Sequence, residues 1–375
     1  MVARIATWPG WRVVSCLLAV LVVAYMAFFA LTRPSWEWDI IPYSMIVLKG
    51  GISDIATAHA KAYALIEAYV PANVFAELKS NTPNTQIHHA NPGALASYLP
   101  LWECKLGYVL LLKAIAAFTD PIVAMIALSL AATVAAFAVV FWQAWRLPGI
   151  AGLGWLPLIV VFGLPTMASM LSPDPVTILV YTAGFAAFLS ARWRVASALF
   201  LAAVFLRPDS AVTNFVLAVA MLACAPREAV VVLLGSFGIY LLDVGITGHV
   251  GWWAQVYLSF IAPPSELTGF QPVFSLSTYL SILAGSAQEM LHRKWLFDAL
   301  AIIIVAAIML AHRPDRPAEI LLLALAATML VRFAAYPSTE IRHYSPALLG
   351  ICLIVLRAGA SFVPMDRNRL PIPSG

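Results

Sequence analysis

The chain of 375 residues has 62% hydrophobic and only 11% charged side chains, whereas about a quarter of the residues in soluble domains are charged. This composition indicates an integral membrane protein and excludes a disordered chain. The 22 basic and 18 acidic residues leave a net charge of +4, which is too small for a basic nucleic-acid-binding face. The four cysteines are scattered, mostly in apolar runs, so neither a disulfide framework nor a cysteine zinc pair is predicted.

A helix needs about 20 apolar residues to cross a bilayer. The first such run, Val13 to Leu31, follows Arg4 and Arg12, and this order predicts a cytoplasmic N-terminus. Nine further runs complete an all-α polytopic fold of about ten transmembrane helices. They are Ile122 to Trp145, Leu153 to Met170, Val176 to Ser190, Val195 to Leu206, Ala211 to Ala225, Ala229 to Thr247, Asp298 to Ala311, Ala318 to Ala335 and Ser345 to Leu356.

One more apolar stretch, Leu95 to Phe118, is long enough to span but contains Glu103, Lys105 and Lys113, which are costly at bilayer depth. The positive-inside rule decides how to place it. If it does not cross, the cytoplasmic side carries eleven basic and four acidic residues, and the outer side carries eleven basic and fourteen acidic ones. We therefore predict an amphipathic or re-entrant helix on the outer face.

The resulting organisation is a single membrane domain over residues 1–375. It has a first extracytoplasmic loop with surface helices at 32–121, a second large extracytoplasmic loop at 248–297 and a cytoplasmic tail at 358–375. The same charge rule favours a hairpin of two short helices over Val195 to Ala225, rather than one span. Its tip, with Arg207, is predicted to lie below the outer membrane surface, facing protein or a water-filled cavity.

Most of the unusual polar residues fall on the outer side in this topology, so the protein is predicted to act there, in the plasma or inner membrane. Asp39 follows the first span directly, between Trp38 and a short apolar run. A carboxylate at this interface is placed to act as general base for a hydroxyl group. The alternative is that Asp39 only caps a helix that begins near Pro42.

Arg342, His343 and Tyr344 precede the last span. The planar guanidinium of arginine suits phosphate binding, and histidine adds a donor or a group that titrates near neutral pH. An ordinary loop with an interfacial tyrosine is the alternative. Arg207, at membrane depth, needs an anionic ligand or a carboxylate partner, and Asp209 or Asp174 would serve equally well as that partner.

Other candidates carry weaker signals. His88 and His89 lack a third ligand at metal spacing, so a solvated loop pair is favoured and no metal site is predicted. Lys105 and Lys113 either snorkel to lipid headgroups or approach a lipid phosphate. The sequence contains no P-loop, Gly-rich dinucleotide turn, His-Glu-x-x-His or Gly-x-Ser-x-Gly motif, so no nucleotide cofactor is expected.

The arrangement resembles the GT-C superfamily of integral membrane glycosyltransferases, particularly its bacterial polyprenol-linked mannosyltransferase-like branch. Trp38-Asp39, followed by Tyr43, Leu48 and Gly50, is similar to the motif of the family's first loop. The segment Tyr98-Leu99-Pro100-Leu101 is similar to the start of the family's second surface helix. Ser172-Pro173-Asp174-Pro175, Leu206-Arg207-Pro208-Asp209 and Arg342-His343-Tyr344 resemble features of its later outer loops.

The resemblance implies a polyprenyl-phosphate-linked sugar as donor, a glycan or glycolipid as acceptor, and inversion at the sugar carbon. It implies Asp39 as the catalytic base and no further cofactor. The expected substrate-binding residues are Arg342, His343, Tyr344, Arg207, Asp174, Glu37, Tyr43 and His89. A lipid or solute transporter and a membrane acyltransferase that uses His88 or His89 as base are the alternative functions.

Overall fold

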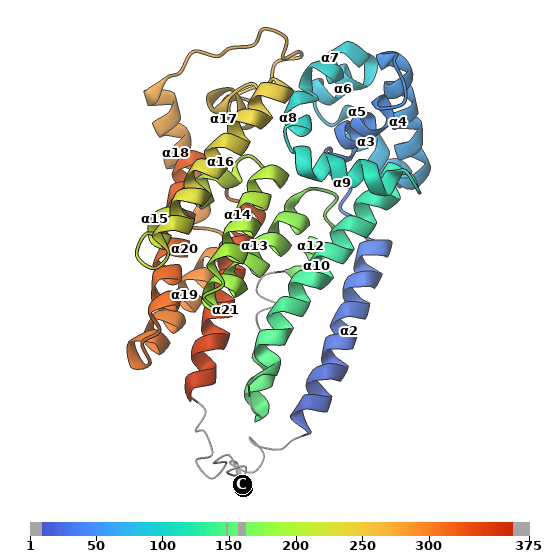
Figure 1. The fold of residues 1–375 in the computed structure, drawn as a ribbon. Coiled ribbons are helices and arrows are strands. Elements are labelled where there is room, and N and C mark those ends of the chain that lie inside the picture. Colours follow the sequence, from blue (N-terminus) through green and yellow to red (C-terminus); the bar gives the residue numbers. More distant parts are fainter. Residues whose placement is uncertain (1–9, 148, 157–162, 363–375) are drawn as a thin grey trace, which may run out of the picture.

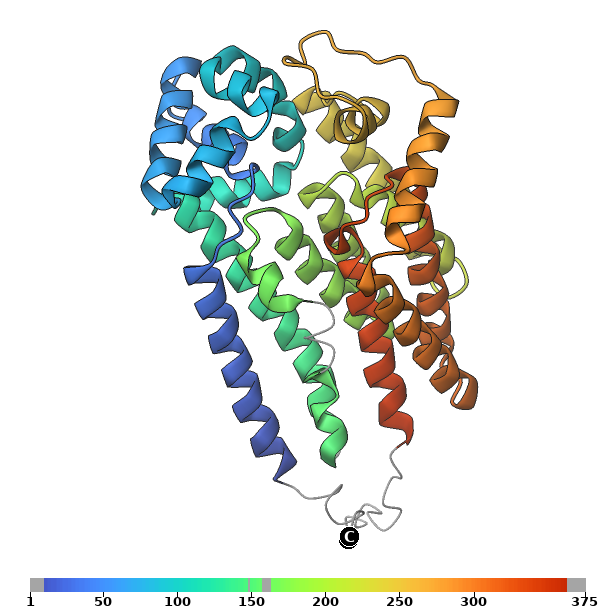
Figure 2. The same cartoon turned by 180° about the vertical axis from the view of Figure 1, so that it is seen from behind.

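The computed structural model describes residues 10–147, 149–156 and 163–362. Within these ranges the regular secondary structure is helical. One isolated parallel β-bridge joins Ser35 and Met170. Long helices run side by side in one body, and a group of short helices, α3 to α9, lies together at one end of that body (Figures 1 and 2). We refer to this group, residues 40–116, as the cap.

Five of the described helices are long and apolar enough to cross a membrane. They are α2 (Trp11–Thr32), α10 (Pro121–Trp145), α16 (Pro226–Thr247), α19 (Lys294–His312) and α20 (Arg316–Ala335). Large apolar side chains on these helices point outward; Leu17, Phe237 and Leu330, for example, are more than half exposed. An apolar surface of this extent indicates contact with lipid rather than water.

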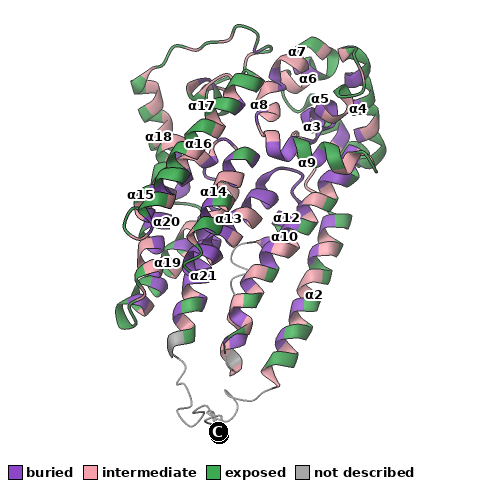
Figure 3. Cartoon of the chain, in the orientation of Figure 1, coloured by how far each residue is buried: buried purple, intermediate pink, exposed green. Residues whose placement is uncertain are grey.

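Four shorter apolar helices complete the body: α13 (Asp174–Leu189), α14 (Trp193–Leu206), α15 (Ser210–Met221) and α21 (Ser345–Phe362). In Figure 3, α13 and α21 carry mostly buried residues and lie among the other helices. The helical membrane architecture predicted from the sequence is thus confirmed, and the count of ten spans stays a prediction. Residues 358–362, assigned from the sequence to the cytoplasmic tail, continue α21, and the rest of that tail lies outside the described residues.

The span predicted from Leu153 to Met170 is not one helix. A 3₁₀ turn, η1 (Gly149–Leu153), and a short helix, α12 (Leu164–Ser169), represent it, and residues 157–162 lie outside the described ranges. The Trp155 indole N–H donates to Ser15 Oγ near the start of α2 at 2.9 Å, whereas the Ser35 N–H donates to the Ser169 carbonyl just past its end at 2.8 Å. The two described ends of the segment therefore lie beside the two ends of α2. Gly163, at φ +58°, adopts a backbone conformation there that favours glycine.

The first outer loop predicted at 32–121 contains the cap. Its helices are α3 (Ile40–Lys49), α4 (Ile55–Tyr69), α5 (Ala72–Ser80), α6 (Pro83–Ala90), α7 (Pro92–Tyr98), α8 (Pro100–Glu103) and α9 (Leu106–Ala116). Local sequence sets these short lengths, because Asp54, Thr82 and Asn91 accept hydrogen bonds from first-turn N–H groups and prolines begin three of the helices. The single helix predicted from Leu95 to Phe118 is wrong: α7, α8 and α9 divide that stretch.

The hairpin predicted over Val195 to Ala225 is present as α14 and α15. Asn214 Nδ2 in α15 donates to the Phe200 carbonyl in α14 at 2.7 Å and to Ser236 Oγ in α16 at 2.9 Å. The Tyr181 hydroxyl in α13 donates to Asn214 Oδ1 at 3.0 Å. These buried polar contacts fix the hairpin against its neighbours, and its tip presents Arg207 and Asp209.

The second large loop, 248–297, contains α17 (Trp252–Phe260), an extended segment and α18 (Leu276–Met290). The extended segment crosses to the cap, where the Leu267 N–H donates to Ser97 Oγ at 2.9 Å and the Tyr98 hydroxyl donates to the Pro264 carbonyl. Asn84 Nδ2 donates to the Pro263 carbonyl at 3.1 Å. We call residues 261–275 the strap, because it joins α17 to the cap.

Candidate functional site

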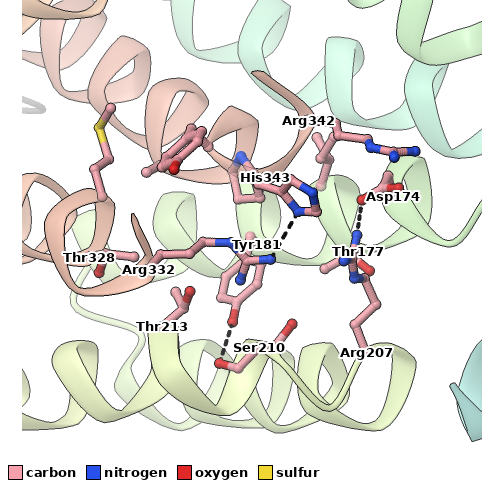
Figure 4. Close-up of a pocket in the computed structure, with 15 residues that line it drawn as sticks. Asp174, Thr177, Tyr181, Arg207, Ser210, Thr213, Thr328, Arg332, Arg342 and His343 are labelled. Carbon is pink, nitrogen blue, oxygen red and sulfur yellow. Dashed lines mark hydrogen bonds and ion pairs between the residues drawn. The ribbon is translucent and has the colours of Figure 1, made fainter. Parts of the chain in front are cut away.

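Charged side chains meet where the α14–α15 turn approaches the start of α13 and the end of α20. Arg207 forms an ion pair with Asp174 through Nη1, and one edge of its guanidinium binds Asp209, through Nε at 3.1 Å and Nη2 at 3.0 Å. Arg332 in α20 also binds Asp209. Figure 4 shows Arg207, Asp174 and Arg332 directed toward one pocket. Both carboxylate partners that the sequence offered for Arg207 are therefore used.

The ion pairs keep Asp209 charged. Burial by itself would raise the pKa of its carboxyl group, but Arg207 and Arg332 hold that pKa well below the usual range. The carboxylate therefore stays ionised at any ordinary pH. Asp174, Arg207 and Arg332 line a pocket of about 20 Å³, which has room for one water molecule.

His343 lies over this cluster. Its Nδ1 is 3.3 Å from Nη2 of Arg332, and burial, followed by the charges of Arg332, Arg207 and Arg342, lowers the pKa of its imidazole well below the ordinary value. The side chain is consequently neutral at physiological pH. In that state it positions Arg332 and offers a hydrogen bond, but it adds no positive charge.

Arg342 connects the last outer loop to the first. Its Nη1 donates to Glu37 Oε2 at 2.9 Å, and its Nε forms an ion pair with Glu340. Glu37 itself is held by the Ser35 hydroxyl at 3.0 Å. Glu37 therefore acts on Arg342, and the structure does not place it on the wall of the cavity that contains Asp39.

Asp39 opens into a cavity of about 350 Å³ between the cap and the long helices. It directly precedes α3, but its side chain accepts no hydrogen bond from the first turn of that helix. The capping role is thus wrong for Asp39. Its half-buried carboxylate shares the cavity wall with Asp174, Arg207, Arg342 and His343, so four of the predicted substrate-binding residues do gather around the predicted base.

Lys105 lies on the same wall, between α8 and α9. Its ammonium group is 5.6 Å from the centre of the Tyr43 ring and 5.7 Å from that of Trp102. Within the described ranges no carboxylate oxygen lies within 4.0 Å of it. Burial lowers the pKa of Lys105, against the opposing charge of Asp39. It is a cation held by aromatic rings and open to an anionic ligand.

Three predicted binding residues, Tyr43, Tyr344 and His89, lie off the wall of the Asp39 cavity, although Tyr344 lines the pocket of about 20 Å³ beside the charged cluster. Tyr43 is fully buried in the cap against Tyr108, at 5.0 Å between ring centres, and lies off the cavity wall. Tyr344 is also buried; its hydroxyl donates to the Ser338 carbonyl at 2.8 Å and its ring stacks on Trp295. His89 is exposed beside Tyr63. In a helical α6 the two neighbouring histidines point to different faces, and His88, only 2% exposed, is the one on the cavity wall.

A second, apolar cavity of about 580 Å³ adjoins the first. It is a groove formed by residues of α15, α16, α17 and α20, among them Phe215, Phe237 and Val331. Four residues line both the groove and the Asp39 cavity: Arg207, Gln255, Tyr336 and His343. The apolar groove therefore ends at the charged cluster, with Asp39 on the far side.

Comparisons with protein-family models, with characterised proteins and with solved structures find no match to this chain.

Sequence reasoning missed one cation of the site. Arg332 sits within the run predicted as the span Ala318 to Ala335, and an arginine inside an apolar run is itself a signal of a functional or paired position. Lys105 was predicted either to snorkel to headgroups or to approach a lipid phosphate, and the structure places it on the wall of the Asp39 cavity. The described residues contain no group of three or more histidine, cysteine or acidic side chains positioned to hold a metal ion.

Proposed function

We propose that the protein is a membrane glycosyltransferase that moves a sugar from a polyprenyl-phosphate donor to an acceptor hydroxyl group on the outer face of the inner membrane. The observation that carries the proposal is the order of three environments: an apolar groove, a cationic cluster and a cavity that contains the carboxylate of Asp39. A lipid-linked sugar phosphate has a matching order of groups: an apolar chain, an anionic phosphate and a sugar. The resemblance to the GT-C superfamily adds independent support.

The lipid chain would occupy the groove, between Phe215 and Phe237, where burial of apolar surface favours binding. Its phosphate would then lie at the junction, within reach of Arg332, whose Nε is buried without a hydrogen-bond partner among the described residues, and of Lys105 across the cavity. Arg207 is largely committed to Asp174 and Asp209, so its main effect is to hold the cluster in place.

In the reaction, the acceptor oxygen attacks the anomeric carbon as the bond from that carbon to the phosphate oxygen breaks. Asp39 accepts the proton of the acceptor hydroxyl group, and the electron pair of the broken bond stays on the lipid phosphate. Fixed cations stabilise that developing charge. Attack from the side opposite the phosphate inverts the sugar carbon.

The test is the conservative replacement Asp39→Asn, assayed with purified protein in lipid nanodiscs and polyprenyl-phosphate sugars. Loss of a general base lowers turnover by about 10²- to 10⁴-fold, and we expect a drop in this range with unchanged folding. Asp54→Asn is the matched control, because Asp54 caps α4 on the exposed side of the cap and asparagine caps equally well. Turnover by Asp39→Asn at the level of Asp54→Asn would refute the proposal.

One observation favours a second candidate, a membrane acyltransferase: the buried His88 faces the cavity, as a histidine base would. The same variants, assayed with an acyl donor as well as with the polyprenyl-phosphate sugar, separate the two. If the chain transfers acyl groups, His88→Gln abolishes activity and Asp39→Asn retains it, whereas the glycosyltransferase proposal requires the larger loss in Asp39→Asn.

A further inference from the structure

The end of the strap and the first turns of α18 expose a group of large apolar side chains. Val273 is 89% exposed, Phe274 51%, Leu276 60% and Leu280 52%. Leu276 and Leu280 are one turn apart, so they share one face of α18. We call these four residues the apolar ridge. Most other side chains of α18 are also exposed or partly exposed, and the described part of the chain does not cover the ridge.

The sequence around the ridge is unlike that of a loop in water. No charged residue stands between Glu266 and Glu289, whereas about a quarter of the residues in soluble domains are charged. Large apolar side chains that gather on an exposed surface mark a contact with another molecule or with a membrane. Because the whole stretch lacks charge, its partner is expected to be apolar as well.

Aromatic contacts fix the ridge beside the apolar groove. The Trp253 indole N–H donates to the Val273 carbonyl at 3.1 Å, and the Trp253 ring centre lies 5.0 Å from that of Phe274. The neighbouring Trp252 lines the groove, and its indole N–H donates to the Ala335 carbonyl at the end of α20 at 2.6 Å. The ridge is therefore held near the end of a helix that is long and apolar enough to cross a membrane.

Lipid is the partner that these surroundings favour. Phe237 of α16 lines the same groove as Trp252 and is 60% exposed on the surface that we assign to lipid contact. Tryptophan and tyrosine rings prefer the membrane–water interface, and Trp252, Trp253 and Tyr279 form such a group next to the ridge. In both views α18 stands at the edge of the body away from the cap, where lipid can reach it (Figures 1 and 2).

We propose that the apolar ridge inserts into the outer leaflet of the membrane and anchors the second outer loop in lipid beside the apolar groove. The other end of the strap is bound to the cap, at Ser97 and Asn84, so the loop is attached at both ends. An interfacial segment of this kind buries its apolar face about 5–10 Å into the boundary between headgroups and acyl chains. The inference goes beyond the proposed function and does not depend on it, because it concerns the membrane and not the substrate.

The experiment uses the full-length protein in phosphatidylcholine nanodiscs, with the fluorophore NBD on single cysteines in a cysteine-free background. Val273→Cys and Leu280→Cys report on the ridge, and both side chains are exposed enough to carry the label without disturbing the packing. Thr268→Cys is the matched control, since Thr268 is exposed in the same strap where the strap contacts the cap. Phe237→Cys is the control for a side chain that faces lipid.

Nitroxide-labelled phosphatidylcholine quenches a fluorophore in the bilayer, and iodide quenches one in water. We expect the nitroxide lipid to quench NBD at Val273 and Leu280, more strongly with the nitroxide near the headgroup than at the chain end, because the insertion is shallow. Iodide should quench the label at Thr268 and leave the ridge labels bright. Iodide quenching of the ridge labels without nitroxide quenching would overturn the proposal. Protection from both quenchers would overturn it too, because protein would then cover the ridge.

Added charges test which face inserts. With NBD at Val273, the double change Leu276→Asp and Leu280→Asp should abolish quenching by the nitroxide lipid, because a carboxylate is costly in the bilayer. The double change Ser277→Asp and Ser281→Asp adds the same charges, with the same spacing, at exposed polar positions of the same helix, and it should retain the quenching. Equal quenching in the two double variants would contradict insertion through the ridge.

Discussion

The charged residues of the site fall into two groups. Arg207, Arg332 and Arg342 each bind at least one carboxylate, as expected for cations that have lost much of their hydration. Lys105 has aromatic rings beside it instead. A cation that keeps its charge in a half-buried cavity without a carboxylate contact is poised for an anion from outside the protein. We therefore place Lys105 among the residues that bind the donor phosphate.

This role predicts a pH dependence. Burial lowers the pKa of Lys105 below that of a solvent-exposed lysine, and only the protonated form attracts phosphate. Activity should therefore fall as pH rises through that lowered pKa. In Lys105→Arg the alkaline fall should move to higher pH, because arginine stays protonated. Lys105→Gln should lower kcat/KM at neutral pH by about 10- to 100-fold, the range expected for a lost hydrogen bond to a charged group.

Lys113→Gln is the control for this measurement, because Lys113 projects from the exposed face of α9 in the same part of the cap. Its pH profile should match that of the unaltered protein. An unchanged alkaline limb in Lys105→Arg, or near-normal kcat/KM in Lys105→Gln, would remove Lys105 from the site.

At the scale of helices, Gly107 permits a close contact between α9 of the cap and α14 of the body. Gly107 begins the first turn of α9, where a Cβ atom would lie 2.7 Å from Cδ1 and 2.9 Å from the carbonyl oxygen of Phe205 in α14. The side chain of Phe205 can turn aside, but its backbone oxygen is fixed by the helix. Gly107→Ala should thus force α9 away from α14, at a cost of about 1–3 kcal/mol, the usual penalty for overpacking.

The measurement is the thermal unfolding temperature in nanodiscs, which should fall, together with transfer activity, because Lys105 lies just before the displaced helix. Gly245→Ala in α16 is the control, since a Cβ there meets no atom within 4 Å. Alanine is a better helix former than glycine, so that variant should keep or slightly raise the unfolding temperature. Equal unfolding temperatures for the two variants would show that the contact at Gly107 is not tight.

The sequence predicted what depends on local pattern. Long apolar runs correctly indicated α2, α10, α16, α19 and α20, and charge placement correctly favoured a break at Arg207. The unbroken helix over Leu95 to Phe118 was wrong, because hydropathy does not register that Pro100 starts a new helix and that the chain turns again at Lys105.

The residues predicted for the candidate site also include some that the structure places on the cavity wall and some that it does not. Asp39, Asp174, Arg207, Arg342 and His343 were predictable as charged or polar groups beside apolar runs, and they do line one cavity. Tyr43 and Tyr344 were predicted from the short motifs and His89 from the histidine pair, yet none of the three lines that cavity. Which neighbour faces the cavity depends on tertiary packing, and sequence spacing does not determine it.

For the whole molecule, the cap and the strap lie at one end of the long helices (Figures 1 and 2), and residues of both line the Asp39 cavity. That concentration fits a protein that works at one membrane face, and positive-inside counting predicts that this is the outer face. Each span that joins this end to the other then has a defined direction. The orientation can be tested without knowing any substrate.

The last prediction concerns this orientation. In a cysteine-free background, cysteines at Phe118 (93% exposed, between α9 and α10) and at Asn81 in the cap should react with a membrane-impermeant maleimide added from outside. A cysteine at Ala223, exposed in the turn between α15 and α16, should react only after the membrane is permeabilised. Protection at 118 with labelling at 81 would mean that the chain crosses between them, and it would reverse every later helix. Labelling of all three from outside would be incompatible with α15 crossing from the cap end to the cytoplasm.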